Sequence, residues 1–318
     1  MNIAPSAKDG AFFIQVLNMA KRNNLRKLNG ATKRFIAVST IPTFILYFLF
    51  VIYPIIQMFY LSLVKWNGLL GKKTFVGLNN YKILFTQDKY FGPAFRNTIY
   101  LIVVVTGVTF VLAMLFASML AKSNIKGKSF FRVVFYIPNI LSIVVISSIF
   151  YMLYSSDYGI LGPIMKLFGK DYTGVLGNPN QVVNAIAIAM MWQAIGYYMV
   201  MYLAAMDSIS DELYESAGLD GAGKFRQFFS ITLPLTWQVV RVTLTFFIIS
   251  TINMSFLFVK AMTQGGPDGA SNVLLMHMAN QRAAGNFGYA MAIGVVLFIF
   301  AYVLSLFVNW LTSKDPLE

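Results

Sequence analysis

Residues 98–121 read TIYLIVVVTGVTFVLAMLFASMLA and contain no Asp, Glu, Lys, Arg or His. A helix needs roughly 20 mostly apolar residues to cross about 30 Å of hydrocarbon, because every backbone N–H and C=O must be paired within the segment. Five further stretches are also free of these residues: 35–64, 133–156, 172–206, 242–259 and 283–313. The sequence therefore predicts an all-α integral membrane protein with six transmembrane helices.

The composition supports a membrane protein and excludes several other classes. Hydrophobic residues make up 58% of the 318 residues and charged residues only 12%, which is unusual for a soluble domain. The net charge of +13 comes from basic residues between apolar stretches rather than on one soluble basic face, so we expect no nucleic-acid partner. With no cysteine and a single histidine, disulfide frameworks, thiolate catalysis and His/Cys metal sites are excluded.

The basic residues also predict the orientation of the chain in a membrane. The short loop 122–132 carries four Lys or Arg and no acid, so the positive-inside rule places it in the cytoplasm. Six spans then put both termini on the same side, as the basic tail before residue 35 also indicates. The predicted external loop 65–97 is an exception, since it holds six Lys or Arg.

The domain organisation follows from these spans. We expect a cytoplasmic basic tail (1–34), a six-span membrane domain (35–312) and a short cytoplasmic tail (313–318). Residues 11–20 place apolar side chains on one helical stripe ahead of a basic stretch, which indicates an N-terminal interfacial helix. A partly disordered basic tail is the alternative. Within the spans, Pro54 and Pro138 are expected to kink or end their helices.

The longest predicted cytoplasmic loop, between spans four and five, contains a helix-start signal. Ser210 offers an N-cap oxygen, and Asp211 and Glu212 follow near the positive end of the helix dipole. The pattern predicts a short helix from there to about Leu219. Asp220-Gly221 then predicts a turn, because glycine adopts a positive φ without steric cost.

A second short helix is predicted after this turn. Phe225, Phe228 and Phe229 fall on one stripe, and Pro234 is expected to limit the helix. Most helix connections are only a few residues long, so this helix-turn-helix knob is poorly explained as a mere connector. It is typical of a docking surface, although an amphipathic pair lying on its own membrane domain is the alternative.

The knob resembles the EAA loop of ATP-binding-cassette importer permeases, whose pattern is EAA, three residues, G, nine residues, I-x-L-P. Here Glu215-Ser216-Ala217 is followed at the same spacings by Gly221 and by Ile231-Thr-Leu233-Pro234, and only Ser216 departs. Other segments are similar to the carbohydrate type of this family, the MalF-like permeases of maltose importers. They are Phe75–Tyr81, Arg96–Thr98, Phe135–Pro138, Tyr202–Ser210 and Thr263–Pro267.

This resemblance implies a permease subunit of an ATP-driven, binding-protein-dependent importer, forming half of the pathway for a sugar or oligosaccharide. The loop 207–236 would act as a coupling helix in a cleft of a separate ATPase. Its coupling residues would be Glu215, Ser216, Ala217, Asp220, Gly221, Ala222, Phe225, Ile231, Leu233 and Pro234. The implied partners are a second related permease, an ATPase dimer, an extracytoplasmic solute-binding protein and lipid of a bacterial or archaeal cytoplasmic membrane.

The chain itself is expected to bind no cofactor and to catalyse no reaction. Residues 218–225 nearly spell a phosphate-binding loop, but Phe225 stands where a Ser or Thr would hold Mg²⁺. ATP and Mg²⁺ therefore belong on the partner ATPase. His277 has no G-x-S-x-G elbow to complete a hydrolase triad, so we interpret it as an ordinary polar residue.

A solute pathway should appear as polar and aromatic residues within spans, since unpaired polar groups are costly in hydrocarbon. The candidates in spans four and five are Trp192, Gln193, Tyr197, Tyr198, Ser250, Thr251 and Asn253. Packing between helices or an interfacial aromatic belt is the alternative. An ion- or proton-coupled secondary transporter is the rival function, but no span contains the carboxylate that a proton relay usually needs.

Overall fold

The computed structural model describes residues 30–68, 71–121 and 127–313. The interfacial helix predicted at 11–20 lies outside these residues. The chain divides into two compact units after Gln57. The unit before this point holds α2 (Gly30–Tyr47), the π-helical turn η1 (Phe48–Ile52) and the start of α3 (Tyr53–Ser62).

The first predicted span is one continuous apolar helix, Arg34–Ser62. The helix does not end at Pro54, which is the second residue of α3 and comes directly after η1. The wider hydrogen-bond spacing of a π-helical turn accommodates a residue that has no N–H. Of the two outcomes expected at Pro54, a kink or an end, the end is therefore wrong, and the regular α-helix is disturbed by η1 directly before α3.

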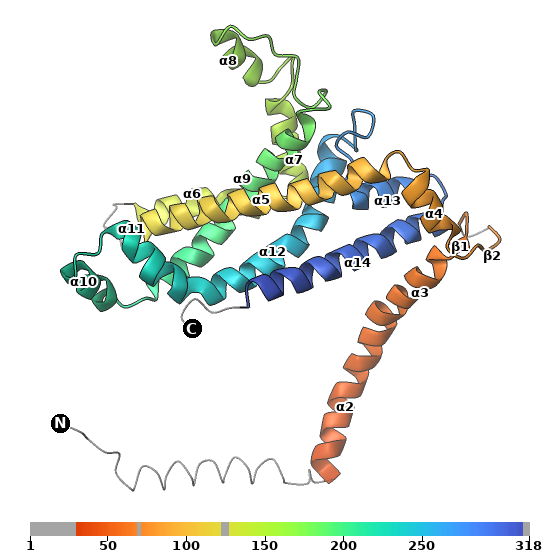
Figure 1. The fold of residues 1–318 in the computed structure, drawn as a ribbon, viewed down its shortest axis with the longest axis horizontal. Helices are drawn as coiled ribbons and strands as arrows, with labels where there is room; N and C mark the ends of the chain where they lie inside the picture. Colours follow the sequence, from red (N-terminus) through yellow and green to blue (C-terminus); the bar gives the residue numbers. More distant parts are fainter. Residues whose placement is uncertain (1–29, 69–70, 122–126, 314–318) are drawn as a thin grey trace. The chain divides into compact units, whose positions relative to one another are not determined.

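The second unit is a helical bundle (Figure 1). Its long helices are α5 (Phe91–Leu120), α9 (Val182–Asp207), α12 (Leu233–Met262) and α14 (Phe287–Leu311). At one end of this bundle lie α10 (Asp211–Leu219) and α11 (Lys224–Gln227). At the other end lie α4 (Asn79–Thr86), α13 (Leu274–Ala283) and a two-stranded ladder of β1 (Val64–Lys65) and β2 (Thr74–Phe75).

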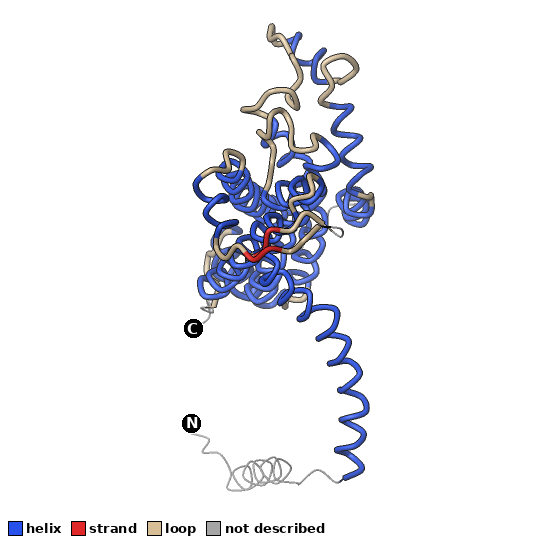
Figure 2. The backbone as a smooth tube through the Cα atoms, turned by 90° about the vertical axis from the view of Figure 1, so that its right-hand side faces the viewer, coloured by secondary structure: helices blue, strands red, loops and turns tan. Residues whose placement is uncertain are grey.

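Figure 2 shows the bundle helices nearly end-on, with the strand ladder at the near end. The ladder is antiparallel and pairs Val64 with Phe75 and Lys65 with Thr74. It is a small departure from the predicted all-α fold. A membrane-embedded strand pair would have unpaired edges, so this ladder fits only outside the hydrocarbon.

The third predicted span, 133–156, is broken rather than straight. It consists of α6 (Lys128–Ile140) and α7 (Ile143–Leu153), which meet at 97°. Pro138 correctly predicted a disturbance, but the break comes after Ile140. Ser142 adopts an extended conformation there, and its Oγ accepts a hydrogen bond from the Val145 N–H, which starts α7. A further short helix, α8 (Leu161–Leu167), follows α7 in the chain.

The described residues contain five helices long and apolar enough to span a membrane, or six if the bent pair is one span. Within the uncharged stretch 172–206 the helix begins at Val182, because Gly174, Gly177 and Pro179 interrupt the residues before it. The predicted fold class is confirmed, with these changes in boundaries.

The core of the bundle is centred on α5 and α9. Phe110 of α5 packs its ring against Tyr198 and Tyr202 of α9 and against Phe247 of α12. The Tyr202 and Thr243 hydroxyls are hydrogen-bonded at 2.9 Å. Such pairing satisfies polar groups that would otherwise be unpaired in a buried apolar setting.

The helix pair α6 and α9 is held by a close backbone contact and an ion pair. A Cβ added to Gly196 of α9 would lie 1.6 Å from the carbonyl oxygen of Phe135, so only glycine fits at this crossing. At the end of α9, the Asp207 carboxylate accepts hydrogen bonds from Lys128 Nζ (3.1 Å) and Arg132 (2.7 Å) of α6. Positive charge at a helix C-terminus also complements the helix dipole.

Candidate functional site

The helix-turn-helix predicted between spans four and five is present as α10 and α11 (Figure 1). We call residues 207–232 the knob. Ser210 Oγ accepts a hydrogen bond from the Glu212 N–H at 3.3 Å, as the N-cap signal predicted. Gly221 has a φ of +79°.

The turn of the knob is a Schellman motif. The Ala222 N–H donates to the Ala217 carbonyl at 2.9 Å, and the Gly221 N–H donates to the Gly218 carbonyl at 3.0 Å. Nothing lies within 4 Å of a Cβ added at Gly221, so its requirement for glycine comes from the backbone conformation alone.

Side-chain hydrogen bonds brace the two helices of the knob. Gln227 Nε2 donates to the carbonyls of Tyr214 (3.3 Å) and Ala222 (2.9 Å). The Tyr214 and Thr232 hydroxyls are bonded at 2.9 Å. The knob is therefore a built element whose shape depends on its own contacts.

Pro234 does not limit the second helix, contrary to the prediction. The helix continues from Lys224 to Met262 through a π-helical turn, η2 (Phe228–Thr232), which Pro234 follows as the second residue of α12. The Leu233 N–H bonds to the Phe228 carbonyl across this turn. As at Pro54, the π-helical spacing accommodates proline without a break.

The surface of the knob is both apolar and charged. Leu219 and Phe225 are 90% and 80% exposed, and Phe229 is 51% exposed. Glu215 is exposed, and it forms no hydrogen bond or ion pair with a described residue. Exposed aromatic side chains beside an unpaired carboxylate are a composition that can engage a protein partner.

The predicted pathway residues differ in their exposure. Trp192 is 42% exposed and packs edge-on against Phe150 of α7, whereas Tyr198 is 8% exposed within the core. Gln193 is half-buried, and Tyr197 is 37% exposed. The structure therefore places Tyr198 in the packing of this chain rather than on an open face.

On α12, the predicted polar residues lie on two faces. Ser250 and Asn253 are exposed at helical spacing. Thr251 is buried and donates its hydroxyl hydrogen to the Phe247 carbonyl at 2.7 Å. The Ser250 hydroxyl donates to the same carbonyl at 3.0 Å, so the difference between these residues is exposure: Ser250 and Asn253 lie on an open face, whereas Thr251 is buried.

The opposite end of the bundle contains a buried polar cluster that the sequence interpretation missed. Asp88, between α4 and α5, accepts hydrogen bonds from His277 Nε2 of α13 (2.6 Å) and from the Tyr289 hydroxyl of α14. Its other oxygen accepts from the N–H groups of Tyr90 (2.8 Å) and Phe91 (3.2 Å), which caps α5. His277, interpreted as an ordinary loop residue, is 3% exposed in its side chain.

These contacts govern the pKa of Asp88. Burial alone would raise it, but the hydrogen bonds from Tyr289, His277 and Tyr90, together with the attraction of His277, leave the pKa below its usual value. Asp88 and His277 are separated by 189 residues in sequence, so no local spacing could have indicated this pair.

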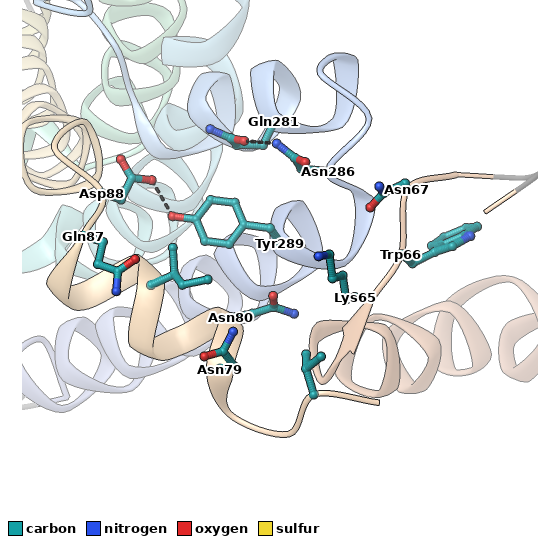
Figure 3. A pocket seen from close by; sticks show the side chains of 12 residues that line it. Lys65, Trp66, Asn67, Asn79, Asn80, Gln87, Asp88, Gln281, Asn286 and Tyr289 are labelled. Carbon is teal, nitrogen blue, oxygen red and sulfur yellow. Dashed lines mark hydrogen bonds between the residues drawn. The ribbon is translucent and has the colours of Figure 1, made fainter. Parts of the chain in front are cut away.

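A polar cavity of about 400 Å³ lies beside this cluster (Figure 3). Six side-chain carboxamides line it: Asn67, Asn79, Asn80, Gln87, Gln281 and Asn286. Figure 3 shows the Tyr289 ring among them, with Lys65 and Trp66 toward one side.

The comparisons with known proteins identify the family. Residues 110–314 match the model of the family described as "Binding-protein-dependent transport system inner membrane component". The chain belongs to this family. It is a multi-pass inner-membrane permease component of an ATP-binding-cassette transporter, and ATP is handled by a separate ATPase.

Two relatives and one solved structure illustrate the similarity. The permease is 32% identical to the diacetylchitobiose uptake system permease protein NgcF of Streptomyces coelicolor, covering 88% of this chain and 83% of that one. It is 30% identical to the multiple sugar-binding transport system permease protein MsmF of Streptococcus mutans, covering 85% and 92%. A chain of a bacterial transporter that imports the acidic polysaccharide alginate shares the fold, with a TM-score of 0.78 at 22% identity, covering 95% and 99%.

Proposed function

We propose that this permease forms half of the pathway of an ATP-driven importer for a sugar or oligosaccharide. The observation that carries the proposal is the knob, which holds the family's EAA pattern on an exposed, internally braced element. The names of NgcF and MsmF refer to the transport of sugars, which supports a saccharide as the solute of this permease. A second related permease and an ATPase dimer complete the assembly.

In this proposal the knob binds the ATPase subunit and moves with it when ATP is bound and hydrolysed. Glu215 pairs with a basic residue of the ATPase, and the apolar side chains of Leu219 and Phe225 enter a cleft of that subunit. Gly221 gives the turn its shape. Ala222 lies in the turn of the knob and Ile231 in η2, and the helix runs on without a break into Leu233 and Pro234 at the start of α12, so movement of the ATPase is passed to a span.

The proposed orientation places the knob and both termini in the cytoplasm. The end with α4, α13 and the strand ladder then faces outward, toward the binding protein. The chain has no cysteine, so single cysteines can test this directly. A membrane-impermeant maleimide should label Asn79→Cys in intact cells and Asp220→Cys only in inverted vesicles, and the reverse pattern contradicts the orientation.

Uptake by the reconstituted complex tests the function. The permease, its sister subunit, the ATPase and the binding protein are placed in proteoliposomes, and ATPase stimulation and uptake are measured with maltotriose, lactose, diacetylchitobiose and an amino acid. We expect one or more saccharides to drive both. Saccharide uptake that needs no ATPase subunit would instead identify a secondary transporter.

A further inference from the structure

We propose that the carboxamide-lined cavity at the end opposite the knob, together with the lysines around it, is a socket for an acidic surface element of the solute-binding protein. We call it the outer socket; it comprises Lys65–Asn67, Asn79–Asp88 and Gln281–Tyr289. The inference rests on the proposed orientation. The family description says that transport depends on a binding protein, and the inference adds which surface of this chain that protein contacts.

The walls of the outer socket contain hydrogen-bonding groups that the described residues leave unused. Asn67, Asn79 and Gln87 make no side-chain hydrogen bond with a described residue. Asn286 Nδ2 donates to Gln281 Oε1 at 2.9 Å, which leaves Asn286 Oδ1 and Gln281 Nε2 available. Free donors and acceptors gathered around one cavity are expected where a polar partner binds.

The charge around the outer socket is unbalanced. Residues 64–91 and 263–289 hold six Lys or Arg and two acids, Asp88 and the exposed Asp268, which lies near Lys89. Asp88 is buried and already bonded to His277, Tyr289 and the start of α5, so it offers little negative charge to the surface. The cations are all exposed, and none forms an ion pair with a described residue: Lys65, Lys72, Lys73, Lys82, Lys89 and Arg282.

This excess of positive charge offers an explanation for the six Lys or Arg in the loop 65–97, which the positive-inside rule does not favour in an external loop. Lysines in an external loop oppose the positive-inside rule and therefore need a compensating role. A surface with this excess of positive charge attracts an acidic partner, speeds its association and orients it.

The outer socket is rigid enough to recognise a shape. Asn80 Nδ2 donates to the carbonyls of Ser62 (2.7 Å) and Val64 (3.1 Å), which fixes α4 against β1. A Cβ added to Gly288 would lie 1.8 Å from the Val64 carbonyl oxygen, so α14 also approaches β1 as closely as backbones allow. A preformed cavity loses little ordering entropy when a partner enters.

A protein surface fits these groups better than a saccharide does. Sugars are commonly held against an open aromatic face, but Lys73 Nζ lies 4.8 Å from the Trp66 ring centroid, and Phe287 packs against the same ring at 5.1 Å. The Tyr289 hydroxyl is occupied by Asp88. The exposed lysines, in contrast, match the carboxylates of an acidic protein surface.

Titration of ATPase activity with the binding protein tests the outer socket in the reconstituted complex. For Lys65→Gln/Lys73→Gln at low salt we expect the half-saturating concentration of binding protein to rise about three- to tenfold, with a weaker salt dependence. Asn79→Tyr, which partly fills the cavity, should raise it as well. Lys65→Arg/Lys73→Arg keeps the charge, and Arg34→Gln removes an exposed charge from the other end of the first span; both should match the wild type.

A fluorescence measurement detects docking of the binding protein separately from ATPase activity, so loss of activity in a misfolded variant is not mistaken for loss of docking. A fluorophore on Asn79→Cys should change its emission when the binding protein is added, and one on Arg34→Cys should not. Unchanged half-saturation in the Lys and Asn79 variants overturns the outer socket even if uptake is intact, whereas loss of ATP-driven uptake by wild type would overturn the proposed function instead. A shift in saccharide dependence at fixed binding protein would identify a sugar site and also overturn the proposal.

Discussion

The knob leaves Glu215, Leu219 and Phe225 in the open, whereas the opposite end of the bundle buries Asp88 against His277 and Tyr289. The knob is built from neighbours in sequence, and the buried cluster joins Asp88 to a residue 189 positions away. An exposed local element has side chains available for a partner, while a buried long-range cluster stabilises the fold. The difference predicts that damage at one end affects coupling and damage at the other affects stability.

The largest expected effect is at Gly221. We expect Gly221→Val to abolish ATP-driven uptake while the protein still inserts, because a β-branched residue strongly disfavours φ of +79° and the Schellman turn is lost. Uptake in proteoliposomes, normalised to membrane level, measures the effect.

Two glycines serve as controls for Gly221→Val. Gly223 has a φ of −68° and open space at its Cβ, so Gly223→Val should retain more uptake than Gly221→Val. Gly169, in the same kind of turn after α8 and outside the outer socket, has a φ of +68° and equally open space, so Gly169→Val should be strained yet keep coupling. Equal loss of uptake in Gly221→Val and Gly169→Val would contradict a coupling role specific to the knob.

The second effect concerns the buried cluster. Asp88→Ala leaves His277 and Tyr289 without their partner and uncaps α5, and we expect it to destabilise the fold by about 3 kcal/mol. Thermal unfolding in detergent measures this loss. The control is Asp268→Ala, since Asp268 is exposed and its one hydrogen bond with a described side chain is the 3.3 Å bond that it accepts from the Tyr90 hydroxyl. Similar melting temperatures for both variants would rule out a stabilising role for Asp88.

The pKa of Asp88 predicts a dependence on pH. A carboxyl whose folded-state pKa is below its unfolded value stabilises the fold above the unfolded value, near 3.8, and loses this contribution as pH falls through the folded-state pKa. The stability difference between wild type and Asp88→Asn should therefore be constant near neutral pH and shrink below about pH 4. A difference that grows on acidification would show the opposite shift.

The smallest effect is at the helix cap of the knob. Ser210→Ala removes the acceptor for the Glu212 N–H and should destabilise α10 by about 1 kcal/mol. Hydrogen exchange of the α10 amides measures it. Ser208→Ala is the matched control, because Ser208 Oγ donates to the Ala205 carbonyl within α9 and, in the part of the chain that the structure describes, caps no helix N-terminus. Equal exchange in both variants would show that the cap contributes nothing.

The sequence predicted the elements that depend on local chemistry. Ser210 and Gly221 mark a helix start and a turn by their own properties, and both are confirmed. The spans are likewise visible in composition. Local rules failed at Pro234, where a π-helical turn let the helix continue. They also could not reveal Asp88 and His277, because only tertiary packing brings these residues together.

The contact between Gly196 and Phe135 has a mechanical consequence. Two helices whose backbones touch at one point and whose ends are joined by Asp207, Lys128 and Arg132 have little freedom to slide past each other. Asp207 is both the last residue of α9 and the first residue of the knob. If the knob is displaced as proposed, we therefore expect α6 and α9 to move together, whereas α7 lies beyond the 97° bend after Ile140 and is not part of this unit.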